Sequence, residues 1–243
     1  MENYYIVIPD IHLQYDRIIS IVRSSLVQDA EKVIFLGDYF DSFDYGHEIP
    51  KICNFLNANV DNPDWIFLIG NHDVHYFSHN NIYRCSGWNE KSQIIIDYNL
   101  KFDPTNQMKF IHHERISGQD VIFSHAGLHP SLAPLNLDAD PESAISAINA
   151  KINMYSPGEN PYIAAGRDRG GTSLVGGLTW MDFYSFEPIT GIHQIVGHST
   201  FRNPSWNNIE GSKNVCIDTN LNHILKINLE TNAWTVYDTK LFI

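Results

Sequence analysis

Residues 33–43 read VIFLGDYFDSF and place two acidic side chains directly after a short apolar run. The run, residues 33–36, is typical of a strand buried on both faces, and it stops at a glycine. Asp38 and Asp41 then follow, three residues apart. A short apolar strand does not need charges at its end. The two carboxylates are therefore candidate metal ligands or an acid/base pair, and the alternative is a turn that is merely acidic.

Two similar apolar runs lie on either side of this one, YYIVI at residues 4–8 and WIFLI at residues 65–69. Helical patterns are predicted between the three runs, over residues 15–26 and 47–57. The polar groups that follow the runs begin at Asp10, Asp38 and Asn71, at intervals of roughly 30 residues, the length of one βαβ unit. Parallel strands joined in this way would bring all three strand ends to one edge of a sheet, where open α/β folds bind ligands.

The second half of the chain shows a different order of elements. Strands are predicted within residues 108–116, 119–128, 193–199, 213–220 and 223–229, and one helix over residues 140–152. Strands that follow one another without an intervening helix are typical of a second, more antiparallel sheet. We therefore expect an α/β protein with two sheets.

Composition limits the class of protein. The chain has 243 residues, of which 43% are hydrophobic and 18% charged, as expected for one globular domain spanning residues 1–243. A net charge of −12 argues against a surface that binds nucleic acid non-specifically. The three cysteines, Cys53, Cys85 and Cys216, are widely separated, which argues against a disulfide framework. We expect neither a signal peptide nor a membrane span, and a cytoplasmic location.

Side chains that can bind metal follow five of the predicted strands. They are Asp10 and His12, Asp38 and Asp41, Asn71 to Asp73, His125, and His198. Taken singly, such an aspartate is more often a turn or helix cap, and such a histidine more often a structural side chain. Five strand ends that all carry these residue types make coincidence a poor explanation. Carboxylate, amide and imidazole groups without a thiolate suit divalent Mn, Fe or Zn.

The donor set is large enough for two ions. One ion would take Asp10, His12 and Asp38, and a second would share Asp38 and add Asn71, His125 and His198. Two divalent ions close together stabilise the attacking and leaving oxygens of a displacement at phosphorus. Their combined charge also exceeds that of the two ligand carboxylates, so such a site would attract a phosphate dianion.

The ordered motifs resemble those of the calcineurin-like metallophosphoesterases. The chain contains DIH at residue 10, GDYFD at residue 37, GNHD at residue 70, SHAGL at residue 124 and GHS at residue 197, then CIDTNLNHILKI. The set is similar to the serine/threonine protein phosphatase-like branch, which includes bacterial and phage members and symmetrical diadenosine tetraphosphatases. The resemblance implies an α/β fold, a two-sheet mixed β sandwich flanked by helices. It also implies two bound divalent metal ions, with Mn²⁺ as the first candidate and Fe or Zn as alternatives.

The resemblance also implies roles for individual residues. Asp38 would bridge the ions, and the nucleophile would be a hydroxide that bridges them too. His72 would be the general acid that protonates the leaving oxygen, and Asp41 would orient it and favour its charged form. Asn71 would contact the substrate as well as a metal. Asp73 replaces the Glu that is typical of the protein phosphatase branch and is expected to stabilise a turn or make a hydrogen bond behind the ligands.

The chain departs from the family pattern after GDYFD. Where protein phosphatases have an Arg-Gly pair whose arginine grips phosphate, this chain has Ser42 and Phe43. The Gly-rich segment AAGRDRGGTSLVGGLTWMD, residues 164–182, offers Arg167 and Arg169 as substitutes. A guanidinium group binds phosphate through two parallel hydrogen bonds. Arg169 is favoured because two glycines follow it, and the alternative is that both arginines are surface charges.

These features predict a phosphatase that acts on a phosphomonoester, in a phosphoprotein or a small phosphorylated molecule. The first alternative is a symmetrical dinucleoside polyphosphate hydrolase, which uses the same core on phosphoanhydrides. An alternative of another class is a metal-containing binding module without catalysis. His72 and Asp41 argue against that module, since neither is needed to hold metal. The expected partner is thus a phosphorylated substrate, and the sequence does not set the oligomeric state.

Overall fold

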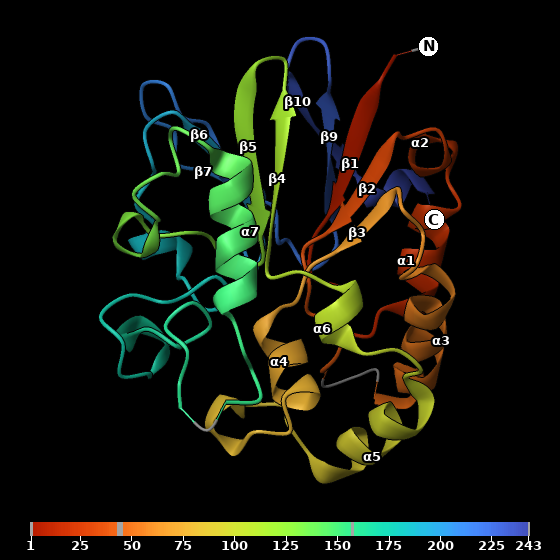
Figure 1. Cartoon of the computed structure of the whole chain (residues 1–243). Helices are drawn as coiled ribbons and strands as arrows, with labels where there is room; N and C mark the ends of the chain where they lie inside the picture. Colours follow the sequence, from red (N-terminus) through yellow and green to blue (C-terminus); the bar gives the residue numbers. More distant parts are fainter. Residues whose placement is uncertain (1, 43–45, 157, 243) are drawn as a thin grey trace.

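The computed structural model describes residues 2–42, 46–156 and 158–242. Within them, two five-stranded sheets face one another and helices lie outside, as Figure 1 shows. The strand orders are β10-β9-β1-β2-β3 and β4-β5-β6-β8-β7. Each sheet combines parallel and antiparallel pairs. The predicted two-sheet mixed β sandwich flanked by helices is confirmed.

The first sheet contains the three runs of the N-terminal third of the chain. Its strands are β1 (Tyr4–Ile8), β2 (Lys32–Phe35), β3 (Trp65–Phe67), β9 (His223–Asn228) and β10 (Trp234–Asp238). β1, β2 and β3 are adjacent and parallel, as their spacing predicts. Their carboxyl ends therefore meet at one edge of the sheet.

The apolar runs are continuous because both faces of this sheet are buried. Tyr5, Val7 and Ile34 belong to the core between the two sheets. Ile6 and Ile8, which alternate with them along β1, belong to the core under the helices. The helices in this half are α1 (Tyr15–Val22), α2 (Ser25–Gln28) and α3 (Ile49–Asn59). The predicted helix over residues 15–26 is thus two helices, and the next one begins two residues later than predicted.

The second sheet contains β4 (Ile111–Ile116), β5 (Gln119–Ser124), β6 (Ile192–Val196), β7 (Ser205–Trp206) and β8 (Asn214–Cys216). Helix α7 (Pro141–Lys151) covers its outer face (Figure 1). The expectation of a more antiparallel sheet is wrong, because β5, β6 and β8 are parallel neighbours. The long segment between β5 and β6 allows that crossover. β9 also leaves this half of the fold and pairs antiparallel with β1.

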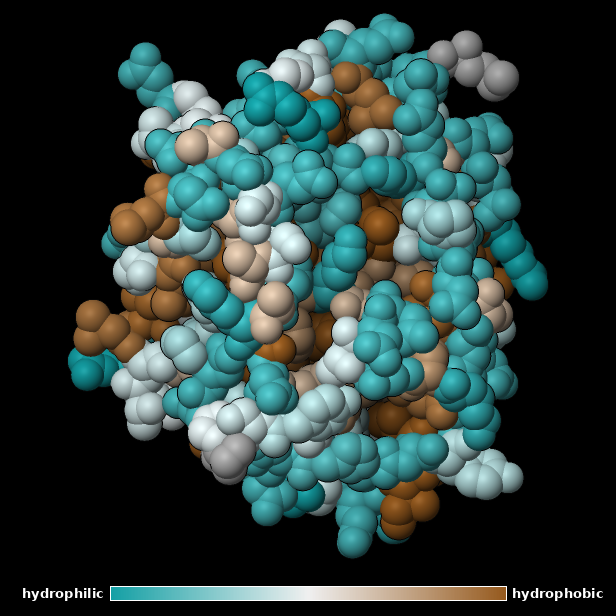
Figure 2. Space-filling view, in the orientation of Figure 1, coloured by the Kyte–Doolittle hydropathy of each residue, from teal (hydrophilic) through white to brown (hydrophobic). Residues whose placement is uncertain are grey.

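Three further helices lie beyond the carboxyl ends of β1 to β3 (Figure 1). They are α4 (Asn71–Phe77), α5 (Glu90–Asn99) and α6 (Pro104–Gln107). Short 3-10 turns are Gly46–Glu48, Asn81–Tyr83, Pro130–Leu132, Arg167–Arg169, Phe183–Ser185 and Thr239–Phe242. Among the described residues, no helix combines the length and the apolar character needed to cross a bilayer. Figure 2 shows a face covered mainly by hydrophilic side chains, with apolar ones scattered among them.

A polar cluster joins the two sheets. Glu114 of β4 contacts Lys32 Nζ of β2, accepts a hydrogen bond from Tyr5 Oη of β1 at 3.3 Å, and lies 2.8 Å from His112 Nε2. Burial raises the pKa of Glu114, but hydrogen bonds from His112 and Lys32 outweigh burial and hold the pKa at about 2. Because the folded pKa is below the ordinary value of 4.5, this stabilisation is present above that pH and is lost as the pH falls toward 2.

Glu114→Gln is expected to lower the free energy of unfolding at neutral pH by about 1–3 kcal/mol. The variant should also lose less stability than the parent protein between pH 5 and pH 2, because it has no carboxylate to protonate there. Urea unfolding at pH 7 and pH 3 measures both effects. Glu210→Gln, at an exposed position, is the control. Equal unfolding free energies for Glu114→Gln and the parent at pH 7 would contradict the stabilising role.

Candidate active site

Five segments from both sheets meet at the common edge. The loops after β1, β2 and β3 carry Asp10, Asp38 and Asn71, each about 1% exposed. β5 of the second sheet delivers His125, which is fully buried, and β6 delivers His198. The structure therefore brings together the side chains that the sequence places after five separate strands.

The backbone at this edge adopts a conformation that non-glycine residues rarely use. His12, Asp38, Asp41 and His198 have φ angles of +45°, +52°, +62° and +66°. Such left-handed residues persist only where their surroundings hold them, and they are common at functional sites. Four residues predicted from sequence as ligands or catalytic groups thus lie in strained turns.

Asp10, His12 and Asp38 form a first cluster of candidate ligand atoms, all within 4.8 Å of one another. His12 Nε2 lies 3.7 Å from Asp38 Oδ2. His12 Nδ1 lies 2.9 Å from the carbonyl oxygen of Asp41 and 3.1 Å from that of Phe40. These carbonyls hold the proton on Nδ1, so the lone pair of Nε2 faces the carboxylates.

Asp38, His125 and His198 form a second cluster, which shares Asp38 with the first. His125 Nε2 lies 3.3 Å from Asp38 Oδ2, 3.0 Å from Asn71 Oδ1 and 3.2 Å from His198 Nδ1. His125 Nδ1 is directed at the carbonyl oxygen of Leu36, at 2.9 Å. The Asn71 amide oxygen is thus within reach of the same centre, and His125 has one nitrogen available there.

The buried carboxylates fit a site for cations. Burial, followed by the charge of Asp218, raises the pKa of Asp10 to about 8. A bound cation would relieve this crowding of negative charge. Two glycines let the carboxylates approach, since a Cβ on Gly70 would lie 2.1 Å from Asp38 Oδ1, and one on Gly197 the same distance from Asp10 Oδ1. The oxygen and imidazole donors suit divalent ions of the Mn, Fe or Zn type.

His72 and Asp41 form an ion pair beside these clusters. His72 Nδ1 lies 2.8 Å from Asp41 Oδ2, and Tyr76 Oη donates to Asp41 Oδ1 at 2.5 Å. Burial lowers the pKa of His72, but the carboxylates of Asp38 and Asp41 outweigh it and raise the pKa to about 11. Burial raises the pKa of Asp41, but hydrogen bonds from His72 and His75 bring it to about 2. These opposite shifts favour the charged pair, and the contact with Asp41 fixes the orientation of the His72 ring.

Asp73 lies behind the ligand loops. Its carboxylate accepts hydrogen bonds from the backbone N–H groups of Asp38 at 2.7 Å, Gly70 at 2.8 Å and Tyr39 at 2.9 Å. This is the supporting hydrogen-bond position expected for it. The contact ties the loop after β2 to the start of α4.

Two neighbours of His72 were missed by sequence reasoning. His75 is fully buried, with Nε2 at 2.9 Å from Asp41 Oδ2 and Nδ1 at 3.1 Å from Cys85 Sγ. The spacing of His72 and His75, three residues apart on α4, was a usable signal. Burial raises the pKa of the Cys85 thiol, but hydrogen bonds from His72 and His75 bring it down to about 7. Cys85 comes from a loop without periodicity, so no sequence signal joined it to them.

The two candidate arginines differ in position. Arg169 Nη2 donates to Ser199 Oγ at 3.1 Å, and Ser199 is the residue after His198. Arg169 Nε lies 2.8 Å from Asp182 Oδ2. Its positive charge lowers the pKa of His198, after burial and His125. Arg167 begins the same 3-10 turn, and both arginines are exposed. Arg169 thus contacts Ser199, the residue that follows His198 of the second cluster.

A cleft of about 780 Å³ opens beside His12, Asp41, Ser42 and His72. Ser42 therefore lines the approach to the site. Phe43, the other departure from the family pattern, lies outside the described residues.

Comparisons with known proteins identify the family and the fold. The sequence model of the calcineurin-like phosphoesterases matches residues 5–144. A cold-active protein-tyrosine phosphatase of the psychrophile Shewanella sp. has 15% identity and a TM-score of 0.58, over 97% of this chain and 80% of that one. A protein serine/threonine phosphatase from Saccharomyces cerevisiae has 14% identity and a TM-score of 0.53, over 97% and 79%. No curated protein sequence matches. These structures share the fold, and the chain belongs to the calcineurin-like phosphoesterase family.

Proposed function

We propose that the protein is a metal-dependent phosphatase that hydrolyses a phosphomonoester on serine or threonine of a phosphoprotein, or in a small phosphorylated molecule. The observation that carries this proposal is the pair of donor clusters that share Asp38, with the His72–Asp41 ion pair beside them. Family membership supports a phosphoester as the bond that is broken.

Two divalent ions, with Mn²⁺ as the first candidate, would occupy the two clusters. Asp10, His12 and Asp38 would hold one, and Asp38, Asn71, His125 and His198 the other. When bound, the ions supply positive charge for the phosphate and an activated water as nucleophile. Asn71 Nδ2 donates one hydrogen to Cys85 Sγ at 3.8 Å, and its second hydrogen is proposed to contact the substrate.

The protein side chains handle the proton of the leaving group. Asp41 binds His72 Nδ1, so the proton on Nε2 is the one available to the leaving oxygen. Once Nε2 has donated it, the imidazole is neutral and keeps its hydrogen bond to Asp41. His72 lines the cleft and is 22% exposed at its side chain, so a substrate oxygen can reach it.

Arg169 is proposed to bind the phosphate in place of the arginine that the family has at Ser42, with Arg167 as the second candidate. Arg169→Ala should raise KM by about 10-fold or more, because a charge-assisted hydrogen bond contributes roughly 1.5–3 kcal/mol. Metal content should not change, since Arg169 belongs to neither cluster. Arg167→Ala is the matched control from the same turn. An unchanged KM in Arg169→Ala would remove this role.

A panel of substrates tests the function itself. The purified protein is loaded with Mn²⁺ and offered p-nitrophenyl phosphate, bis-p-nitrophenyl phosphate, a phosphoserine peptide and diadenosine tetraphosphate. We expect hydrolysis of the two monoesters, and loss of hydrolysis after chelation. The two solved structures compared above are described as a protein-tyrosine phosphatase and a protein serine/threonine phosphatase, which makes the peptide the first substrate to test. Preference for the tetraphosphate would favour the dinucleotide alternative, and no hydrolysis of any substrate would overturn the proposal.

A further inference from the structure

We propose that His72, His75 and Cys85 form a third metal site, which binds Zn²⁺ and inhibits hydrolysis by occupying the proton donor. The inhibitory role rests on the function proposed above, whereas binding of the ion does not. None of the three side chains belongs to the two clusters that share Asp38. His72 is the member that lies nearest to those clusters, with its backbone N–H bound to Asp38 Oδ1 at 2.9 Å.

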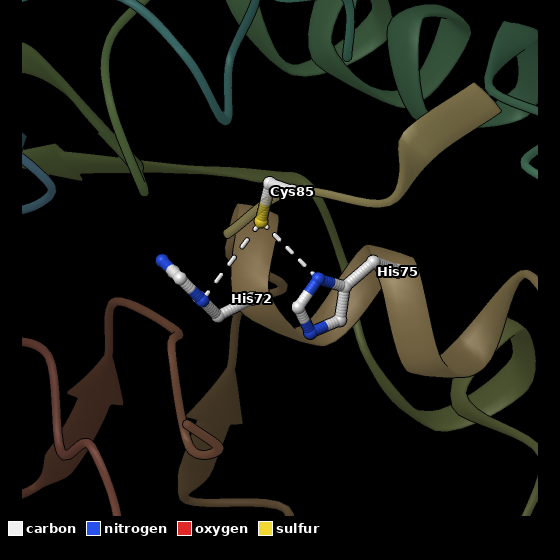
Figure 3. Close-up of side chains that lie close together, drawn as sticks. All are labelled: His72, His75 and Cys85. Carbon is white, nitrogen blue, oxygen red and sulfur yellow. Dashed lines mark hydrogen bonds between the residues drawn. The ribbon is translucent and has the colours of Figure 1, made fainter. Parts of the chain in front are cut away.

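The geometry of the cluster is close to that of a zinc site. Figure 3 shows Cys85 facing His72 and His75, which both come from α4. Cys85 Sγ lies 3.1 Å from His75 Nδ1 and 3.9 Å from His72 Nδ1, and the three ligand atoms all lie within 4.8 Å of one another. In a tetrahedral zinc site, bonds of roughly 2.3 Å to sulfur and 2.1 Å to nitrogen put these atoms about 3.5 Å apart. The two observed distances lie on either side of that value.

The donor set differs in kind from that of the first two clusters. A thiolate with two imidazoles favours zinc over the harder ions that prefer carboxylate oxygen. His75 Nδ1 faces Cys85, and its Nε2 lies 2.9 Å from Asp41 Oδ2 without the geometry of a hydrogen bond, so the carboxylate is close enough to support a metal-bound ring after a small rotation. Three protein ligands leave a fourth position for water.

Binding at this cluster would act directly on His72. Its Nδ1 lies 2.8 Å from Asp41 in this structure, and the ion would take the same nitrogen. The ion would then replace the proton on His72 Nδ1 and any proton held between His75 Nδ1 and Cys85 Sγ, and these protons would pass to solvent. A protonated imidazole that donates from Nε2 becomes a neutral ring, but a zinc-bound imidazole would have to become an anion. Donation to the leaving oxygen is therefore blocked.

Cobalt is the probe that tests binding without reference to activity. A thiolate bound to Co²⁺ gives a charge-transfer band in the near ultraviolet, and neither of the other clusters contains a thiolate. The full-length protein, loaded first with Mn²⁺, is titrated with Co²⁺. We expect the band to saturate at one equivalent and to disappear when Zn²⁺ is added. Cys85→Ser and His75→Asn should abolish or weaken it, and Cys53→Ala, at a buried cysteine elsewhere, should keep it.

Kinetics then test inhibition. Cys85→Ser should hydrolyse p-nitrophenyl phosphate, and the Zn²⁺ concentration for half-inhibition should rise at least 10-fold over that of the parent. Absence of the band in the parent protein, or its persistence in Cys85→Ser, would overturn the site. Unchanged zinc inhibition in Cys85→Ser would overturn the inhibitory role. If the parent shows the band but hydrolyses no substrate, the site stands and the proposed function fails.

Discussion

Asp38→Asn is expected to remove both metal ions and to lower kcat/KM by on the order of 10³-fold or more. Asp38 is the side chain common to the two clusters, so its charge would be lost from both at once. The fold should survive, because an asparagine can keep the oxygen that accepts the His72 backbone N–H at 2.9 Å. Metal analysis after dialysis, followed by kinetics with p-nitrophenyl phosphate, measures the two losses on one sample.

Variants of the other carboxylates separate this shared role from a general effect of charge. Asp10 belongs to the first cluster alone, so Asp10→Asn should lose one ion and keep the second. Asp120 lies at the opposite end of β5 from His125, where it pairs with Arg115 at 3.1 Å, and Asp120→Asn should keep both. Asp38→Asn protein that still holds two ions would contradict the sharing of this carboxylate.

The edge that carries the site could be predicted because its determinants are local. The runs that contain Tyr5 and Ile34 are apolar without interruption, which indicates strands buried on both faces, and their spacing indicates parallel neighbours. The place of β9 could not be predicted in this way. Its run from His223 would suit either sheet, and the choice depends on pairing with β1, more than 200 residues away along the chain.

The same distinction applies to the side chains of the site. Asp38 and His125 lie within three residues of the ends of their strands, so the direction of each strand places them. Cys85 lies in a loop whose path depends on distant contacts, such as the hydrogen bond from the Asn160 backbone N–H to Tyr83 Oη at 3.0 Å. Arg169 likewise contacts Ser199, beside His198, from a long loop and is held by Asp182. Arg169 could be proposed from the two glycines that follow it, but its contacts, like those of Cys85, are set by tertiary structure.

His72→Asn is expected to lower kcat by about 10²- to 10⁴-fold while leaving the metal content unchanged. His72 belongs to neither of the clusters that share Asp38, so its removal should not release their ions. The loss should depend on the substrate. A serine alkoxide needs a proton as it leaves, whereas p-nitrophenolate is stable without one. The phosphoserine peptide should therefore lose far more activity than p-nitrophenyl phosphate, and a ratio of rates measures this on one protein sample.

Asp41→Asn and His79→Asn complete the test of the proton donor. Because the carboxylate of Asp41 raises the pKa of His72, its loss should move the alkaline decline of peptide hydrolysis to lower pH. His79 follows α4, is 59% exposed at its side chain and pairs with Asp97, so His79→Asn should leave the profile where it was. Equal losses for both substrates in His72→Asn would mean that His72 binds the phosphate and does not protonate the leaving group. If the pH dependence of peptide hydrolysis is the same in Asp41→Asn as in the parent, Asp41 does not control the protonation of His72. Its role would then be structural, in the turn after β2.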